Sequence, residues 1–241
     1  IAGEIINSST IVNSIKINEN KQLTTEADKI NGNINNLGNY VLTGGENNNC
    51  IYGTGTTKIN GSVINSSTIV NDVIINKNKQ LTTNATNIIG NIENSGNLIF
   101  NGGANNNTIT GTGITQIYDN VINQANITQN NLEILENKQL TNSTATIRIN
   151  ELLTINNNAK ILNDGKLIIS SGTNNGKIEQ TTNISTTTII GNFINNGTIE
   201  QNKLNIEQTG NLTTNSNSII GNIENNGTLL FNAGTANNNQ I

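Results

Sequence analysis

The strongest constraint on the fold of this chain is a long stretch that occurs twice. Residues Gly3 to Gly55 read GEIINSSTIVNSIKINENKQLTTEADKINGNINNLGNYVLTGGENNNCIYGTG, and residues Gly61 to Gly113 repeat this pattern 58 positions later without a gap. Self-similarity at a fixed period is typical of repeat architectures, in which each unit buries its apolar face only by stacking on its neighbours. The repeat therefore limits the choice of fold before any single motif is considered.

The two copies keep their apolar positions and vary many polar ones. Glu19 becomes Lys77 and Glu26 becomes Asn84, for example. The matched apolar positions, most of them β-branched, are Ile6 with Ile64, Ile11 with Ile69, Val12 with Val70, Ile17 with Ile75, Leu23 with Leu81, Ile34 with Ile92, Val41 with Ile99, and Ile51 with Ile109. We interpret the matched apolar residues as the core and the varied polar residues as the surface.

The composition favours a thin core of aliphatic side chains. Roughly 56 of the 241 residues are Asn, whereas Pro, Met, Trp and His are absent and aromatic residues make up 2%. Disorder would require low hydrophobicity together with a high net charge, but the net charge is −4 and 33% of the residues are hydrophobic. A thick globular core usually recruits aromatic rings, so we expect small side chains arranged in a narrow stack.

Strand signals occur throughout the chain. Short β-branched or Leu runs alternate with polar residues and are bounded by Asn-Gly, Gly-Gly or Asn-Asn pairs. The one candidate helix, at about 131–150, is rich in Asn, Thr and Ile, which are poor helix formers, so we predict strand there too. We divide the chain into repeat units 1–58 and 59–116, a degenerate region 117–211 and a partial unit 212–241. Because it opens and stops within a repeat, we interpret it as a window from a longer protein.

Two folds can use such strands. In a meander, Asn-Gly pairs would close hairpins, whereas in a β-solenoid they would mark corners between the short strands of one coil. We predict an all-β fold, a parallel β-helix (β-solenoid) that is continuous over 1–241, because Asn side chains placed one coil apart can form hydrogen-bonded ladders. Each repeat would comprise about three coils of 19 or 20 residues, which gives about 12 coils in all. By analogy with β-crossovers we expect a right-handed coil.

Residues that could carry catalysis or bind a metal are sparse. There is no His, and the Asp residues are isolated from one another in the sequence. Enzymes that cleave polysaccharides need grouped carboxylates, or Arg and Lys near a carboxylate, but the single Arg, Arg148, lies outside the clear repeats. The GGENNN and GGANNN segments lack the Asp of calcium-binding GGxGxD repeats. We predict no catalytic, cofactor-binding or metal site, no cofactor and no enzyme activity.

Other candidate motifs are better explained as structure. The GTG segments at 53–55 and 111–113 lack the Lys-Ser or Lys-Thr of a phosphate loop, so we interpret them as corners with unusual backbone angles. Cys50 is the only cysteine and is matched by Thr108, which predicts a small strand side chain without a disulfide. The lysines of the recurring NKQL motif, which we interpret as a solvated face, are Lys21, Lys79 and Lys138.

Composition also limits the partners. A pI near 4.9 and the lack of a basic run argue against nucleic acid. The longest apolar runs contain three or four residues, which is too short for insertion into a membrane. We therefore expect no nucleic-acid partner and no direct membrane insertion of this segment.

Two segments carry a resemblance to a known group of proteins. GNIENSGNLIFNGGANNNTITGTG at 90–113 and GNIENNGTLLFNAG at 221–234 resemble the passenger repeats of bacterial autotransporters and of filamentous-haemagglutinin-like surface proteins. The Asn-, Ile- and Thr-rich composition is similar to that of surface antigens of AT-rich bacteria such as the rickettsial group. The likeness covers 1–118 and 183–241 well and the middle of the chain loosely. It implies an extracellular parallel β-helix at the bacterial cell surface, associated with the outer membrane, and it carries over no binding residue.

Three functions follow as hypotheses. We expect a non-enzymatic, adhesin-type rod that binds molecules of a host or of a neighbouring cell. The alternative is a structural coat or filament subunit that joins other copies end to end, because the end of a solenoid offers open strand edges. A carbohydrate-active enzyme would need a groove with clustered acids, which the sequence does not indicate.

Overall fold

The structure, a computed structural model, describes residues 1–215 and 218–232. The chain divides into two compact units, unit 1 (Ile1–Ile114) and unit 2 (Thr115–Ile241). Both are all-β solenoids of parallel strands, with about 13 turns in total, which confirms the predicted fold class; about 12 were expected. The continuity of the solenoid over 1–241 stays a prediction. Within the predicted partial unit 212–241, residues 216–217 and 233–241 lie outside the described residues.

Unit 1 is built from short strands and two 3-10 helices. These elements are β1 (Glu4–Ile6), β2 (Ile15–Ile17), β3 (Gln22–Thr25), η1 (Ala27–Lys29), β4 (Ile34–Asn36), β5 (Asn39–Leu42), β6 (Gly45–Asn47), β7 (Ile51–Tyr52), β8 (Thr56–Ile59), β9 (Ser62–Asn65), β10 (Asp72–Ile75), β11 (Gln80–Thr83), η2 (Ala85–Asn87), β12 (Ile92–Asn94), β13 (Asn97–Asn105) and β14 (Ile109–Thr110).

The later part of the chain has longer strands. They are β15 (Ile114–Asn123), β16 (Ile127–Ile134), β17 (Gln139–Asn142), β18 (Thr146–Ile155), β19 (Lys160–Asn163), β20 (Lys166–Ile169), β21 (Gly172–Asn174), β22 (Lys177–Glu179), β23 (Thr186–Ile189), β24 (Asn192–Asn195), β25 (Thr198–Ile206), β26 (Asn211–Thr214), β27 (Ile219–Asn225) and β28 (Thr228–Phe231). The stretch at about 131–150, for which strand was predicted, forms parts of β16 and β18 and the whole of β17.

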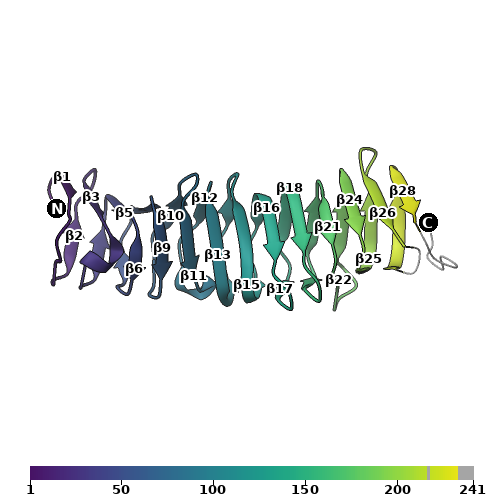
Figure 1. Cartoon of the computed structure of the whole chain (residues 1–241), viewed down its shortest axis with the longest axis horizontal. Coiled ribbons are helices and arrows are strands. Elements are labelled where there is room, and N and C mark those ends of the chain that lie inside the picture. Colours follow the sequence, from purple (N-terminus) through teal and green to yellow (C-terminus); the bar gives the residue numbers. More distant parts are fainter. Residues whose placement is uncertain (216–217, 233–241) are drawn as a thin grey trace. The chain divides into compact units, whose positions relative to one another are not determined.

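The strands of unit 1 form three rows of parallel neighbours, stacked along the chain (Figure 1). The first row is β1, β3, β5, β8, β10, β12 and β14. The second row is β6, β9, β11 and β13. The third row is β2, β4 and β7, continued by parallel bridges from Ile51 to Ile69 and from Ile69 to Ile88. Each row is therefore a parallel sheet, as a solenoid requires and a meander does not allow.

The 58-residue repeat is not a whole number of coils. From Ile5, three steps along the first row lead through Leu23 and Tyr40 to Thr57. The repeat equivalent of Ile5 is Val63, which lies six residues beyond Thr57, on β9 in the second row. One repeat is therefore three coils plus one face, rather than the expected three coils of 19 or 20 residues. Matched residues consequently lie on different faces of unit 1.

Unit 2 has the same parallel arrangement. One row is β16, β18, β20, β23 and β25, and a second is β15, β17, β19, β22 and β25. The third row includes the second halves of β16 and β18 and continues through β21, β24, β26 and β28. Strands β16, β18, β25 and β27 are long enough to continue around a corner, so each contributes to two rows.

Alternate side chains of the strands point inward and form an aliphatic core. Ile34 and Ile92 are 0% and 1% exposed, which confirms their predicted place in the interior. Ile6 and Ile64 are also a matched pair, but they are 86% and 51% exposed. On β9 the preceding Val63 is fully buried, and because successive side chains on a strand alternate in direction, Ile64 points outward. The matched apolar residues that the prediction wrongly placed in the core are Ile6, Ile64, Val12 and Val70.

Buried Asn side chains form hydrogen-bonded ladders between coils, as predicted. In unit 2, Asn123 Nδ2 donates to Asn142 Oδ1 at 3.2 Å, and Asn142 Nδ2 donates to Asn163 Oδ1 at 2.9 Å. In unit 1, Asn47 Nδ2 donates to Asn65 Oδ1 at 2.7 Å. The rungs are residues paired across adjacent strands, and not residues matched by the 58-residue repeat, because that repeat ends on another face.

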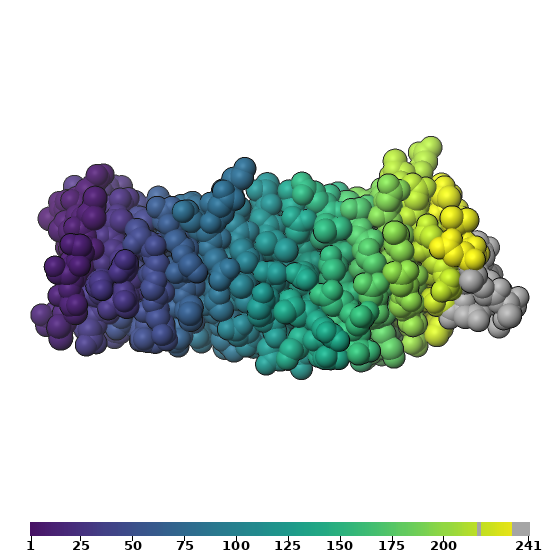
Figure 2. Space-filling view, in the orientation of Figure 1, coloured from purple at the N-terminus to yellow at the C-terminus, as the bar shows by residue number. Residues whose placement is uncertain are grey.

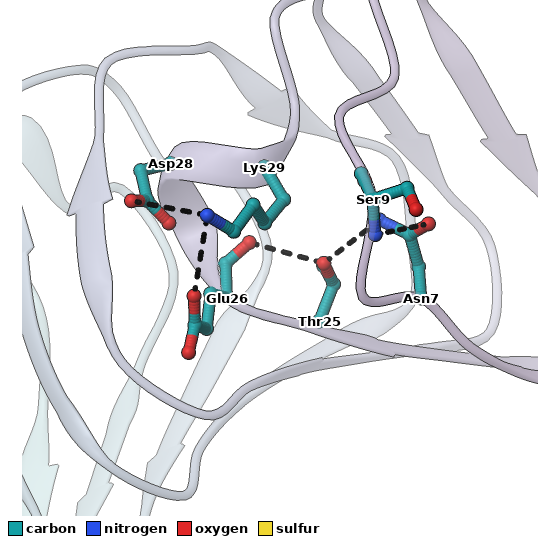
Figure 3. Close-up of polar contacts among 6 residues, drawn as sticks. All are labelled: Asn7, Ser9, Thr25, Glu26, Asp28 and Lys29. Atoms are coloured by element: carbon teal, nitrogen blue, oxygen red, sulfur yellow. Dashed lines mark hydrogen bonds and ion pairs between the residues drawn. The ribbon is translucent and has the colours of Figure 1, made fainter.

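The first corner of unit 1 shows how a recurring Asn closes a bend (Figure 3). Asn7 Nδ2 donates to the Ser9 carbonyl at 2.6 Å and to Thr25 Oγ1 of the next coil at 3.2 Å. Its repeat equivalent, Asn65, makes the corresponding two hydrogen bonds at 2.6 and 3.1 Å. The same local sequence therefore builds the same corner, although the two corners lie in different places around the coil.

Unusual backbone angles explain two of the recurring motifs. Asn20, Asn78 and Asn137 precede the Lys of the NKQL motif and have φ of 58°, 60° and 60°, a left-handed conformation that Asn tolerates better than most residues. Gly53 and Gly111 of the GTG segments have φ of 109° and 119°, and a Cβ on either would lie 2.3 Å from a main-chain oxygen. The GTG segments are thus corners, as predicted.

Candidate functional site

The Asp residues, which are isolated from one another in the sequence, make separate contacts in the structure. Asp72 Oδ1 accepts a hydrogen bond from the Asn91 main-chain N at 2.9 Å. Asp119 accepts one from Asn120 N and lies 3.3 Å from Lys138 Nζ, and these two contacts lower the pKa of its carboxyl. In the part of the chain that the structure describes, no three His, Cys, Asp or Glu side chains are grouped so that they could hold a metal ion.

Asp164 holds a loop in place at the surface of unit 2. Its carboxylate accepts hydrogen bonds from Thr181 N and Oγ1, at 2.6 and 2.5 Å, and from Thr182 N and Oγ1, at 3.0 and 3.3 Å. Partial burial raises the pKa of Asp164, but the four hydrogen bonds together outweigh burial and lower the pKa below its usual value. The carboxylate therefore ties down the loop between β22 and β23, and it has no further acidic partner that would suggest catalysis.

The charged cluster beside the first corner is likewise exposed and local. Lys29 Nζ lies 3.7 Å from a Glu26 carboxylate oxygen and 4.0 Å from one of Asp28 (Figure 3). More than half of each carboxylate side chain is accessible to solvent, so the pairs are screened and contribute little to stability. We assign no chemistry to this cluster.

Cys50 and the recurring lysines also take structural positions. Cys50 lies just before β7 rather than within a strand; it is half-buried, its thiol is unpaired, and its main-chain N donates to Asn33 Oδ1 at 3.1 Å. The lysines of the NKQL motif lie in the turns that precede β3, β11 and β17, and all are half-buried rather than fully solvated; they are Lys21, Lys79 and Lys138.

An open groove of about 400 Å³ lies over β10 and β12 of unit 1. Asp72 and Glu93 both line it, and Ile74 is the strand neighbour of Glu93. Two carboxylates in one groove could suggest acid–base chemistry, but Asp72 already accepts the hydrogen bond from Asn91. Glu93 is the only other acid in the lining. We call this surface the acidic groove.

A second groove, of about 440 Å³, lies over β18, β20, β23 and β25 of unit 2. It brings together Arg148, Lys166 and Lys203, all exposed. Lys166 is the strand neighbour of Thr186, which is in turn the neighbour of Lys203. We call this surface the basic groove; it is the strongest candidate for a binding site in the described residues.

Sequence reasoning missed the basic groove. No basic run exists in the sequence, because 17 residues separate Arg148 from Lys166 and 36 separate Lys166 from Lys203. Arg148 was noticed only as an isolated residue outside the repeats. What could have indicated the groove is that each cation occupies an outward position beside a buried strand residue: Ile147, Leu167 and Leu204. Only the strand register places the three cations on one face.

An outward apolar row occupies the third row of unit 1. Tyr52, Val70 and Ile89 follow the bridged residues of three successive coils and are 41%, 39% and 57% exposed. Figure 2 shows the coils of each unit as adjoining bands without a deep cleft on the visible side. None of the three residues of the row lines either groove.

Comparison of the chain with family models, with curated proteins and with solved structures gave no match. Among the described residues, no helix is both long and apolar enough to cross a membrane. Any functional conclusion for this chain therefore depends on the exposed faces of its two solenoid units.

Proposed function

We propose that this chain is a non-enzymatic repeat protein of the bacterial cell surface, and that it acts as an adhesin by binding molecules of a host or of a neighbouring cell. The observation that carries the proposal is how the chain distributes its polar groups. Inward amides, such as those of the ladder through Asn142, form hydrogen bonds with one another inside the solenoid. The outward polar side chains instead line open grooves on strand faces. Such an arrangement suits binding of an extended partner.

The same distribution argues against an enzyme. Catalytic carboxylates need a second group within reach of the same substrate atom. The acidic groove offers Glu93 beside an Asp72 that is already hydrogen-bonded to the main chain, and the basic groove has one lining acid, Glu207. The resemblance of the repeats to bacterial surface proteins supports the extracellular location.

Cell binding by the purified chain tests this proposal. The chain would be labelled with a fluorophore and added to cultured host cells and to bacterial cells, and bound label would be measured by flow cytometry. We expect saturable binding that an excess of unlabelled chain displaces, and no saturable binding of the heat-unfolded chain. Binding that stays proportional to concentration on every cell type, without displacement, would refute an adhesive role.

The structural alternative is a coat or filament subunit whose copies join through strand edges. The observation that favours it is that Ile5 and Ile6 of β1 are 41% and 86% exposed, because an exposed apolar strand is a template for pairing with another chain. If this alternative holds, the purified chain should form filaments visible by electron microscopy, and Ile6→Lys should abolish them; a chain that remains monomeric at high concentration would exclude it.

A further inference from the structure

We propose that the basic groove of unit 2 binds an extended, polyanionic carbohydrate chain that carries carboxylate or sulfate groups. This inference deepens the proposed adhesive function and depends on it for its biological meaning. It names both the surface that engages the partner and the chemistry of that partner. Arg148, Lys166 and Lys203 would provide the contacts to the anionic groups.

The cations are distributed over several stacked strands, which suits a ligand with several charges. Lys166 and Lys203 lie two strands apart, on β20 and β25 with β23 between them, which separates their main chains by about 10 Å. Arg148 is the neighbour of Ile168, two residues beyond Lys166, so its main chain is roughly 8 Å from that of Lys166. A linear polymer lying across the stacked strands can contact all three cations at once, with one anionic group for each.

Two of the three cations of the groove have no ion-pair partner among the described residues. Arg148 and Lys166 form no ion pair with any residue that the structure describes, and only Lys203 is paired, with Glu224 at 2.6 Å. Arg148 Nε donates to Asn150 Oδ1 at 3.1 Å, which orients the guanidinium and leaves its two terminal nitrogens for a bidentate contact with a carboxylate or sulfate. These cations are notable because the chain as a whole carries a net charge of −4.

The floor of the groove favours a carbohydrate over a nucleic acid. Its lining includes Thr186, whose hydroxyl can exchange hydrogen bonds with sugar hydroxyls, and the aliphatic Ile190, with Ile168 buried at the floor. None of the described residues that line the groove is aromatic, whereas proteins that bind single-stranded nucleic acids stack bases on aromatic rings. The acidic pI of about 4.9 also disfavours a nucleic acid.

Binding of defined polymers by the purified full chain tests the proposal. Dextran sulfate and polygalacturonate serve as the sulfated and carboxylated probes, uncharged dextran as the neutral control, and duplex DNA as the competing class; affinities are measured by biolayer interferometry. We expect binding to at least one charged polysaccharide, no binding to dextran, and an affinity that falls as salt rises from about 50 to about 200 mM. The sulfated and carboxylated arms identify which anion the groove prefers.

Matched variants locate the binding surface. The double variant Arg148→Ala/Lys166→Ala should weaken polyanion binding about tenfold or more, whereas Lys16→Ala/Lys77→Ala, which removes the same charge from exposed positions of unit 1, should change it less than about twofold. Glu207→Gln, which removes the acid that lines the groove, should strengthen binding. Arg148 and Lys166 point outward, so circular dichroism and thermal unfolding of the double variant should match those of the wild type.

The outcomes separate this inference from the adhesive function. No polyanion binding, equal losses in both double variants, or tighter binding to DNA than to either polysaccharide would overturn the inference. If Arg148→Ala/Lys166→Ala lost polyanion binding but still attached fully to cells, the groove would bind polyanions without mediating adhesion. Polyanion binding by a chain that attaches to no cell would instead reject the adhesive function and retain the site.

Discussion

Asn142 is the central rung of a buried amide ladder, and its replacement by Ala tests whether such ladders stabilise the solenoid. The side chain is fully buried. It accepts a hydrogen bond from Asn123 Nδ2 at 3.2 Å and donates to the Ala145 carbonyl at 2.8 Å and to Asn163 Oδ1 at 2.9 Å. Asn142→Ala therefore removes three buried hydrogen bonds, although Asn123 Nδ2 still donates to the Ala125 carbonyl and the Ala145 carbonyl still accepts from Lys166 N.

The expected cost follows from these three partners. A typical intramolecular hydrogen bond contributes about 1 kcal/mol to stability, so the loss of three gives about 3 kcal/mol. This loss would shift the folding equilibrium by roughly a hundredfold. We expect the loss to concentrate around β17 and its neighbour β19, because each coil of a repeat protein contacts only the adjacent coils.

Urea unfolding followed by circular dichroism would measure the total loss, and amide hydrogen exchange would show where it falls. Asn150→Ala is the matched control, since Asn150 is exposed and a surface substitution of this kind changes stability by less than about 0.5 kcal/mol. If Asn142→Ala were no more destabilising than Asn150→Ala, the amide ladder would not stabilise the fold. If Asn142→Leu were more stable than the wild type, the cost of burying the amides would exceed the gain from their hydrogen bonds.

Three further predictions test the core, a corner and the loop between β22 and β23. The Tyr40 hydroxyl is buried and has no hydrogen-bond partner among the described residues, so Tyr40→Phe should stabilise unit 1 by about 1–3 kcal/mol in urea unfolding; a loss of stability would contradict this, and Tyr52→Phe on the exposed surface should have little effect. Gly111→Ala should destabilise by about 2 kcal/mol in thermal unfolding, because φ is 119° and the added Cβ would meet a main-chain oxygen at 2.3 Å; Gly3→Ala, which has open space, should not, and equal effects would refute the strain argument. The lowered pKa of Asp164 means that its stabilising effect is complete above the unfolded pKa, near 4, and is lost as pH falls through the folded pKa. The protection of the loop amides against hydrogen exchange, relative to their intrinsic rates, should therefore fall below about pH 4. In Asp164→Asn this protection should be low already at neutral pH. Wild-type protection that stays the same across this pH range would disprove the role of the carboxylate.

The local sequence patterns determined the type of fold. Alternating β-branched and polar residues specify strands with one buried side, as the burial of Ile34 and Ile92 confirms. Asn and Gly at the ends of these runs specify corners: Gly111 takes a conformation that an L side chain rarely adopts, and Asn78 a left-handed one. Because these preferences act within a few residues, the sequence alone was sufficient to predict a parallel β-solenoid with amide ladders.

The tertiary structure alone decided the register between coils. The number of residues in a coil depends on the lengths of its strands and corners. Only the hydrogen bonds between stacked coils show at which residue the chain returns to the same row. For this reason the sequence did not reveal that one repeat is three coils plus one face, nor that the matched Ile6 and Ile64 both point outward. The gathering of Arg148, Lys166 and Lys203 on one surface has the same origin, because it depends on contacts between residues of different coils that no local pattern encodes.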